Sequence, residues 1–345
     1  MRARLLLLAA LPVTLLAQPR KVIIDQDVES ASDSNLRSIA MCLHDSSVEV
    51  LGLTIQIGDG PRDPGVGHTL RLLEAAGRGD IPVVPGAAAP LVLTRPELLL
   101  WEKQFGRIGW KGAWSHPLDP QAEAAPLPGG PPSLRPSPEI AANFLVRMVR
   151  RYPGEVTIIA GGPATDIALA SALDPAFAAA AKELVLFGGE FDLATQRPKR
   201  RSFNWLFDPE AMRIVLHAPW RRIELIASGS MTGVVMTPAM EEALAQSPSP
   251  LVRHLLSQPN PNRTYPMWDE MGMAVWLDPS LVTQAVDLQI DVNLDRGKGY
   301  GSMQAWDRGA GPGLGEPLVH VVLGVDPVRF DQLFVEQVSR TGPVK

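Results

Sequence analysis

The sequence predicts an α/β fold, a single doubly wound domain with a mostly parallel sheet and helices on both faces. Two observations support this prediction. Short β-rich apolar runs alternate with helical patterns for most of the 345 residues. The amphipathic stretch 140–151 also ends at Pro153-Gly154, directly before another apolar run. The apolar fraction of 46% is enough for a sizeable buried core.

The individual elements follow in order along the chain. The first helix is expected to begin after Ser34 or Asn35, two residue types that favour the N-cap position. Because ligands bind at the carboxyl ends of parallel strands, functional residues are expected in the loops after them. Strands are expected at residues 22–25, 50–57, 81–84, 156–160, 184–187 and 223–227, and helices at residues 36–43, 70–76 and 140–151.

One stretch, residues 94–137, does not fit this alternation. It is rich in Pro, Gly and Trp, and it is too long for a plain connection between two elements. A domain boundary is the alternative interpretation, but the alternation resumes unchanged at Pro138. We therefore expect one domain over residues 18–345, with residues 94–137 as an insertion or lid.

The first 17 residues are typical of a signal peptide. Arg2 and Arg4 precede an apolar run at residues 5–16, and Ala17 is a small residue at a suitable cleavage point before Gln18. The run is too short to span a bilayer, so no stable membrane association is expected. A buried first strand and an uncleaved anchor are the alternatives. The sequence thus predicts an exported protein, periplasmic or extracellular.

Charge and residue usage exclude several classes of function. The net charge of −5 offers no basic face for nucleic acid. Cys42 is the only cysteine, which rules out an intrachain disulfide and a cysteine-based zinc site. It lies in an apolar helical stretch, where we expect it to be buried and inert. The six histidines form no ligand-spaced pair, and His116 is the one candidate for protonating a leaving group.

The most informative segment is the acidic loop after the first predicted strand. It contains Asp25, Asp27, Glu29 and Asp33, four acids within nine residues. Carboxylates this close repel one another unless a cation holds them, and oxygen ligands suit Ca²⁺ or Mg²⁺. A solvated acidic turn is the alternative. The position after an apolar strand favours a metal site or a catalytic site.

Two families place Asp-x-Asp directly after a first apolar strand. Phosphatases of the haloacid dehalogenase type usually follow it with Gly-Thr or Gly-Val, whereas Val28-Glu29 stands here. The rest of the chain is similar to the inosine/uridine-preferring nucleoside hydrolases, nearly from end to end. The segments that carry this resemblance are 50–54 with Gly58-Asp59, 70–91, 153–158, Gly162-Pro163-Ala164-Thr165-Asp166-Ile167-Ala168, 185–189, Phe203-Asn204 with 208–211, and Trp268-Asp269 with 277–279.

The resemblance implies hydrolysis of the N-glycosidic bond of a nucleoside, a small-molecule substrate, with homo-oligomers as a further implication. Asp27 stands where the family's water-activating Asp lies. The implied Ca²⁺ ligands are Asp27, Asp33, the Gly161 carbonyl and Asp269, with Glu29 and Ser34 as additional candidates. The implied substrate contacts are Asp25, Asp59, Ser202, Phe203, Asn204 and Trp268.

The chain also departs from the family pattern. The closing Asp-Asp of the acidic motif falls on Ala31-Ser32 without a gap and on Asp33-Ser34 with a two-residue insertion. Ser202 stands where many members have Glu, and Trp268 where some have His. Two alternatives to the hydrolase remain, the first favoured by the missing acids and the second by the Asp-x-Asp motif. One is a ribosyl-ligand binder that lost the metal, and the other is an Asp-nucleophile phosphatase.

Overall fold

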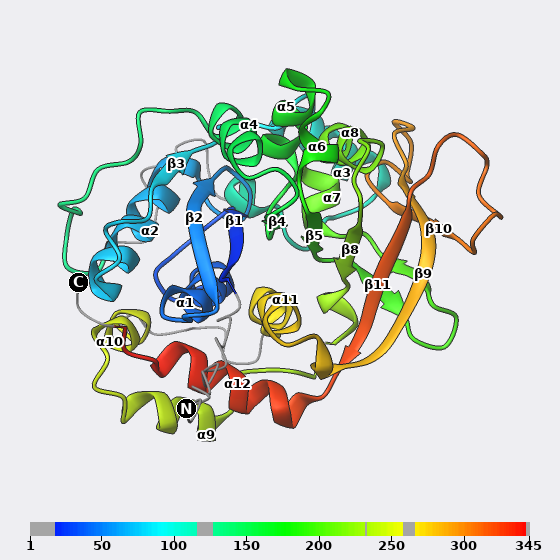
Figure 1. Ribbon diagram of the computed structural model, residues 1–345. Coiled ribbons are helices and arrows are strands. Elements are labelled where there is room, and N and C mark those ends of the chain that lie inside the picture. Colours follow the sequence, from blue (N-terminus) through cyan, green and yellow to red (C-terminus); the bar gives the residue numbers. More distant parts are fainter. Residues whose placement is uncertain (1–17, 116–126, 232, 258–265, 343–345) are drawn as a thin grey trace, which may run out of the picture.

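The computed structural model describes residues 18–115, 127–231, 233–257 and 266–342. A nine-stranded sheet forms the centre, in the order β10-β9-β11-β8-β5-β4-β1-β2-β3 (Figure 1). Within this sheet the neighbouring strands β3, β2, β1, β4, β5, β8 and β11 pair in parallel. Strands β9 and β10 form the other edge through antiparallel pairings. The sheet strands are β1 Arg20–Gln26, β2 Val48–Ile55, β3 Val83–Pro85, β4 Val156–Ala160, β5 Glu183–Phe187, β8 Ile223–Ile226, β9 Val282–Val292, β10 Met303–Trp306 and β11 Leu318–Val325.

Helices cover both faces of this sheet, so the predicted fold class is confirmed (Figure 1). Ile24 of β1 packs in one apolar cluster with α1, α2 and α9 to α12, and its neighbour Ile23 packs in a second cluster with α4, α5 and α8. The helices are α1 Ser34–Leu43, α2 Arg62–Ala76, α3 Arg95–Phe105, α4 Ala141–Arg151, α5 Thr165–Leu173, α6 Phe177–Ala180, α7 Phe203–Phe207, α8 Pro209–Leu216, α9 Pro238–Ala245, α10 Pro250–Leu255, α11 Trp268–Leu277 and α12 Pro327–Ser339.

Three 3₁₀ turns, Gly112–Ser115, Ser228–Ser230 and Pro279–Leu281, and a hairpin of β6 (Glu190–Asp192) with β7 (Arg197–Arg200) complete the described elements. None of the described helices is long and apolar enough to cross a bilayer. The expected signal peptide, His116 and residues 116–126 of the insertion lie outside the described residues.

The start of α1 differs from the sequence prediction. Asp33, rather than Ser34 or Asn35, is the N-cap, and its Oδ1 accepts from the Leu36 amide at 2.8 Å. Its Oδ2 accepts from the backbone amides of Glu29 at 2.6 Å and Ser30 at 2.8 Å. A carboxylate that accepts three backbone N–H groups is a stronger cap than a neutral side chain. As a result, Ser34 and Asn35 lie inside the first turn of the helix.

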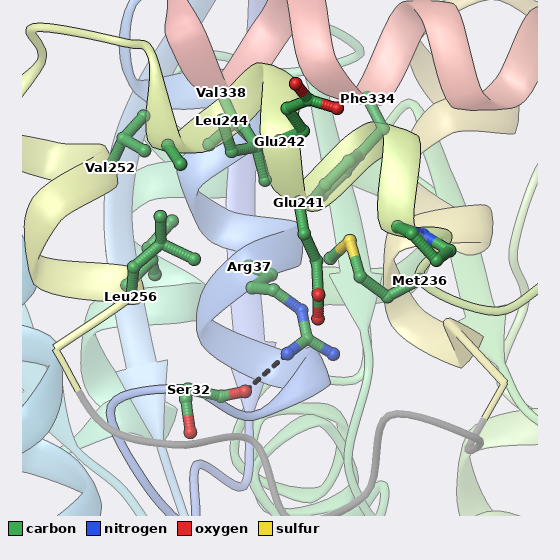
Figure 2. A pocket seen from close by; sticks show the side chains of 13 residues that line it. Ser32, Arg37, Met236, Glu241, Glu242, Leu244, Val252, Leu256, Phe334 and Val338 are labelled. Atoms are coloured by element: carbon green, nitrogen blue, oxygen red, sulfur yellow. Dashed lines mark hydrogen bonds between the residues drawn. The ribbon is translucent and has the colours of Figure 1, made fainter.

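A cavity of about 420 Å³ lies between α9, α10, α12 and the beginning of α1 (Figure 2). Its lining is largely apolar, with side chains such as Leu244, Leu256 and Phe334, and it also contains Ser32 and Arg37. Because Ser32 belongs to the acidic loop and Arg37 to α1, the cavity borders that loop from the side of these helices.

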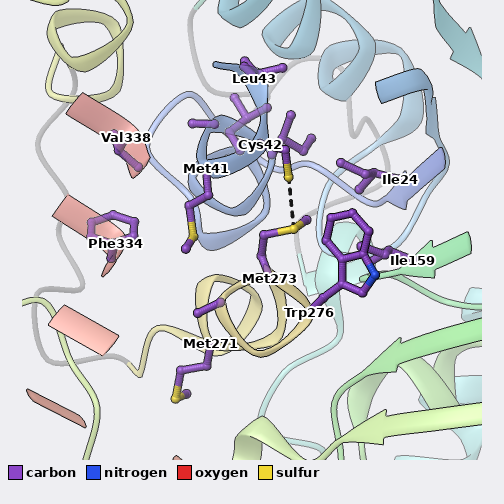
Figure 3. Packing of buried hydrophobic residues seen from close by; sticks show 14 of the residues in the cluster. Ile24, Met41, Cys42, Leu43, Ile159, Met271, Met273, Trp276, Phe334 and Val338 are labelled. Carbon is purple, nitrogen blue, oxygen red and sulfur yellow. Dashed lines mark hydrogen bonds between the residues drawn. The ribbon is translucent and has the colours of Figure 1, made fainter. Parts of the chain in front are cut away.

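Cys42 is buried in the packing between α1 and α11, as predicted (Figure 3). Its Sγ lies 3.1 Å from Met273 Sδ, and Met41, Met271 and Trp276 belong to the same apolar cluster. Burial raises the pKa of the Cys42 thiol well above its usual value. Because the thiolate is the reactive form, this thiol is poorly suited to nucleophilic chemistry.

Candidate functional site

Asp25 and Asp27 both lie at the carboxyl end of β1, and both are buried. They make different contacts. Asp25 accepts hydrogen bonds from Thr54 Oγ1 at 2.5 Å and Gln56 Nε2 at 2.6 Å. Burial, followed by the nearby carboxylate of Asp166, raises the pKa of Asp25 well above its usual value. Asp25 therefore joins the ends of β1 and β2 and makes no hydrogen bond to Asp27.

Asp27 lies at the centre of the second set of contacts. Its Oδ1 accepts from Asn35 Nδ2 at 2.9 Å, and its Oδ2 accepts from the Asp59 backbone amide at 2.8 Å. Asn35 Nδ2 also lies 2.8 Å from Asp269 Oδ2, at the beginning of α11. The structure thus brings Asp27, Asp59 and Asp269 together and adds Asn35, which the sequence reasoning missed.

Two glycines make room for the Asp27 carboxylate. A Cβ on Gly58 would lie 2.1 Å from Asp27 Oδ2, and a Cβ on Gly162 would lie 2.8 Å from Asp27 Cγ. Real Cβ atoms do not approach other heavy atoms this closely, so any side chain at either position would displace the carboxylate.

The carboxylates of this cluster raise one another's pKa. Burial raises the pKa of Asp27 well above its usual value, and Asp59 and Asp269 add to the effect. The pKa of Asp269 is also raised well above its usual value, by burial and then by Glu270 and Asp59. Burial raises the pKa of Asp59 to about 6. Buried acids of like charge at a strand end favour a proton or a cation between them.

The described residues contain no cluster of three or more His, Cys, Asp or Glu side chains arranged to hold a metal. Oxygen donors nevertheless gather here, although Asn35 presents its Nδ2 to the two carboxylates and its amide group would have to turn to offer the oxygen. Asp27 and Asp269 supply two carboxylates, Asn35 contacts both, and the Gly161 carbonyl is the fourth candidate. Carboxylate, amide and backbone carbonyl oxygens suit a hard cation such as Ca²⁺, with an affinity that falls as carboxylates are lost.

The remaining residues of the acidic loop lie beside this set. The Asp33 carboxylate is occupied by the three backbone amides that it caps. Ser34 Oγ donates to Glu270 and accepts from the Asp269 amide at 3.0 Å. Glu29 is partly exposed, and burial, with Asp59 and Asp33, raises its pKa to about 7. None of these side chains makes a hydrogen bond to Asp27 within the described residues.

The expected sugar contacts lie on α7 and α11. Asn204 Nδ2 donates to the Gly161 carbonyl at 2.6 Å, which ties α7 to the loop beside Asp27. Ser202 precedes α7 and is buried, and the Phe203 ring packs against Phe207 at 5.3 Å between centroids. Trp268 is 39% exposed at the first position of α11, beside Asp269.

The described part of the 94–137 stretch reaches the same edge of the sheet. Trp110 Nε1 donates to Asp59 Oδ1 at 2.5 Å. The Ala113 amide donates to the Gly58 carbonyl at 2.8 Å, and Ala113 and Trp114 pack in an apolar cluster with Phe207. This segment therefore lies against the loop that holds Asp27, a contact that the prediction of an insertion or lid did not specify.

Residues 22–332 match the family model described as inosine-uridine preferring nucleoside hydrolase. A probable uridine nucleosidase 2 of Arabidopsis thaliana is 32% identical over 238 residues, which cover 68% of this chain and 67% of that protein. The solved structure of a plant nucleoside hydrolase is 25% identical, with a TM-score of 0.72, and the match covers 93% of this chain and 99% of that one. A purine-preferring ribonucleoside hydrolase from Gardnerella vaginalis, 18% identical with a TM-score of 0.69 over 93% of this chain and 98% of its own, shares the fold.

Proposed function

The chain belongs to the inosine-uridine preferring nucleoside hydrolase family and is an N-glycosyl hydrolase, and we propose that Asp27 activates the water that it uses. The observation that carries this proposal is the setting of Asp27. Its carboxylate is buried between Gly58 and Gly162 and contacts Asn35 and the Asp59 amide. Its raised pKa makes it a stronger base than a solvated Asp.

The proposed reaction is a single displacement at the anomeric carbon of the ribose. Asp27 takes a proton from water, and the water oxygen forms a bond to that carbon. The C–N bond breaks, and its electron pair leaves with the base, which then takes up a proton. The Asp59 amide donates to Oδ2 of Asp27 at 2.8 Å and helps to hold the carboxylate in one orientation during proton transfer.

We propose Ca²⁺ as the metal of the site. Asp27, Asp269 and the Gly161 carbonyl would hold it, together with the Asn35 oxygen once the amide group has turned, because Nδ2 faces the two carboxylates in this structure. A bound cation lowers the pKa of a water that it holds and attracts sugar hydroxyls. Asn35 is neutral, so the site has two carboxylates, Asp27 and Asp269, around it. Because calcium affinity falls with the number of charged ligands, we expect weaker binding than at a site with three carboxylates.

The substrate is proposed to be a ribonucleoside. Asn204 and Ser202 are candidates for ribose hydroxyls, with Phe203 and Trp268 near the base. Asp25 and Asp59 would support the sugar from the β1 and β2 ends. His116 stays a prediction for the acid that protonates the leaving group. Because the Arabidopsis relative is named as a uridine nucleosidase, uridine is the first substrate to test.

The test measures ribose release from uridine, inosine and nitrophenyl riboside, with calcium and with chelator. Hydrolysis in calcium that is lost in chelator would support both the reaction and the metal. Equal rates in chelator would overturn the metal. The absence of ribose release from all three substrates in saturating calcium would overturn the hydrolase and leave the ribosyl-ligand binder.

We further propose that the protein is exported and that residues 94–137 act as a lid. Removal of residues 1–17 would leave β1, which begins at Arg20, intact. The contacts of Trp110 and Ala113 with the loop beside Asp27 support a covering role. N-terminal sequencing of the native protein should find Gln18, and recovery of Met1 would overturn export. Assembly into homo-oligomers is testable by light scattering.

A further inference from the structure

The first turns of α1 and α11 are joined by a dense set of polar contacts. Ser34 Oγ donates to Glu270 Oε2 and accepts from the Asp269 amide at 3.0 Å. Arg37 Nε donates to Glu270 Oε1 at 2.5 Å, and Arg37 also donates to the Ser32 carbonyl. Both oxygens of Glu270 therefore bind α1, and Arg37 ties the same point to the acidic loop.

Glu270 is fully buried, and the Arg37 side chain is 12% exposed. A buried carboxylate is tolerated when it is paired and when its oxygens accept hydrogen bonds, and separation of such a pair is strongly unfavourable. This pair consequently resists any sliding of α1 along α11.

Leu36 and Ile39 pack in the apolar cluster with α11, but the other side of the beginning of α1 faces a cavity. Ser32 and Arg37 line the cavity of about 420 Å³ under α9 and α12, so side-chain packing against this turn is incomplete there (Figure 2). In Figure 2 the Arg37 guanidinium lies toward that space and contacts the Ser32 carbonyl. The polar contacts of Arg37 and Glu270 thus compensate for missing packing.

The proposed metal site begins one residue away on each helix. Asn35 follows Ser34, Asp269 precedes Glu270, and Asn35 Nδ2 joins Asp269 to Asp27. We propose that Ser34, Arg37 and Glu270 are positioning residues: they hold the two first turns in register so that Asn35 and Asp269 meet Asp27. This inference rests on the proposed function because it gives Asn35 and Asp269 their role in the site.

The test compares Glu270→Gln with the double variant of Arg37→Met and Glu270→Met, in the full chain. The double variant replaces the ion pair with apolar side chains, a change that buried pairs often tolerate without loss of stability. Asp291→Asn is the matched control, because Asp291 is a buried carboxylate of β9 paired with Arg213 and His217. Calcium affinity is measured by calorimetry. Hydrogen exchange of α1 and α11 is measured in calcium-free protein.

Glu270→Gln and the double variant should both bind calcium roughly 10–100-fold more weakly, as when groups that hold metal ligands are removed. In calcium-free protein, exchange should accelerate in the first turns of α1 and α11 while the sheet stays protected. Asp291→Asn should change neither result. Unchanged calcium affinity and unchanged exchange in the double variant would overturn the positioning role.

The exchange measurement also separates this inference from the proposed metal. If the unmutated protein binds no calcium, the metal of the proposed function is wrong. The exchange data then decide alone whether the network holds the two helices in register. Acceleration confined to the first turns would still support it, and exchange equal to that of the unmutated protein would overturn it.

Discussion

Asn35 donates a side-chain hydrogen bond to Asp269 at 2.8 Å, across 234 positions of sequence. The same amide nitrogen contacts Asp27 at 2.9 Å. A neutral amide therefore stands between two buried carboxylates, where it can hydrogen-bond to both without adding a negative charge. The calcium-free site is stabilised by this arrangement, because an acid at the same position would repel Asp27 and Asp269.

Asn35→Asp should increase calcium affinity and lower the stability of the calcium-free protein. A third carboxylate would add charge to the donor set, and charge count tunes calcium affinity. We expect calcium to bind on the order of tenfold more tightly, and the calcium-free variant to melt at a lower temperature than the unmutated protein. Calorimetry with and without calcium checks both effects. If calcium affinity does not increase in this variant, residue 35 is not a calcium ligand.

Asp27→Asn should abolish most of the ribose release and leave the fold intact. The change is nearly isosteric and removes the proposed base, whose contribution is typically about 10²–10⁴-fold. Asp63→Asn, at an exposed carboxylate in the first turn of α2, is the control and should retain full activity. Comparison of kcat with circular dichroism checks the prediction. Residual activity within a few-fold of the control would show that another group activates the water.

The central sheet could be predicted because its buried strands are continuous apolar runs, such as β4 and β5. The antiparallel edge was missed. In β9 the residues from Val282 to Asp287 are partly or fully exposed, so this strand lacks a continuous apolar signal. The beginning of α1 was also misplaced, since neutral capping residues follow Asp33 and the sequence alone does not show which side chain accepts the amides.

Asp27 was identified because it is an acid at a strand end and also matches the family motif, whereas Asp269 was identified from the family resemblance alone. Asn35 could not be predicted because it is not an acid, and the two alignments of the acidic motif place its closing pair on Ala31-Ser32 or Asp33-Ser34. An offset of one more residue aligns that pair with Ser34-Asn35. The three-dimensional contacts of Asn35 with both acids were needed to reveal it.

Gly162→Ala should reduce activity because the new Cβ displaces the Asp27 side chain, to which all three nearest atoms belong. The new Cβ would lie 2.8 Å from Asp27 Cγ, so the carboxylate has to move from its place beside Asn35 and the Asp59 amide. We expect kcat to fall by at least about tenfold, since displacements near 1 Å at a reacting group are costly. Gly233→Ala is the control, because its Cβ would meet nothing within 4 Å. Equal kcat in the two variants would contradict the tight fit.

Glu29 should make the calcium-free protein less stable as the pH rises. Burial, with Asp59 and Asp33, raises its folded pKa from 4.5 to about 7, so the folded state holds this proton more tightly than the unfolded state. Its contribution to stability is complete below about pH 4.5 and is lost as the pH rises through 7. Melting temperatures of the unmutated protein in chelator should therefore fall over this interval, and those of Glu29→Gln should fall less. Parallel curves would contradict the assignment.

Trp110→Phe tests the contact between the 94–137 stretch and the site. Phe keeps an aromatic ring and removes the Nε1 donor that binds Asp59 Oδ1 at 2.5 Å. Because that hydrogen bond lowers the pKa of Asp59, its loss should raise this pKa above about 6. If the segment covers bound substrate, KM for uridine should rise several-fold with a smaller change in kcat. Trp101→Phe removes a comparable donor from α3, which binds the Gly297 carbonyl at 2.9 Å, and serves as the control. Equal KM values for the two variants would show that Trp110 supports the loop without covering the substrate.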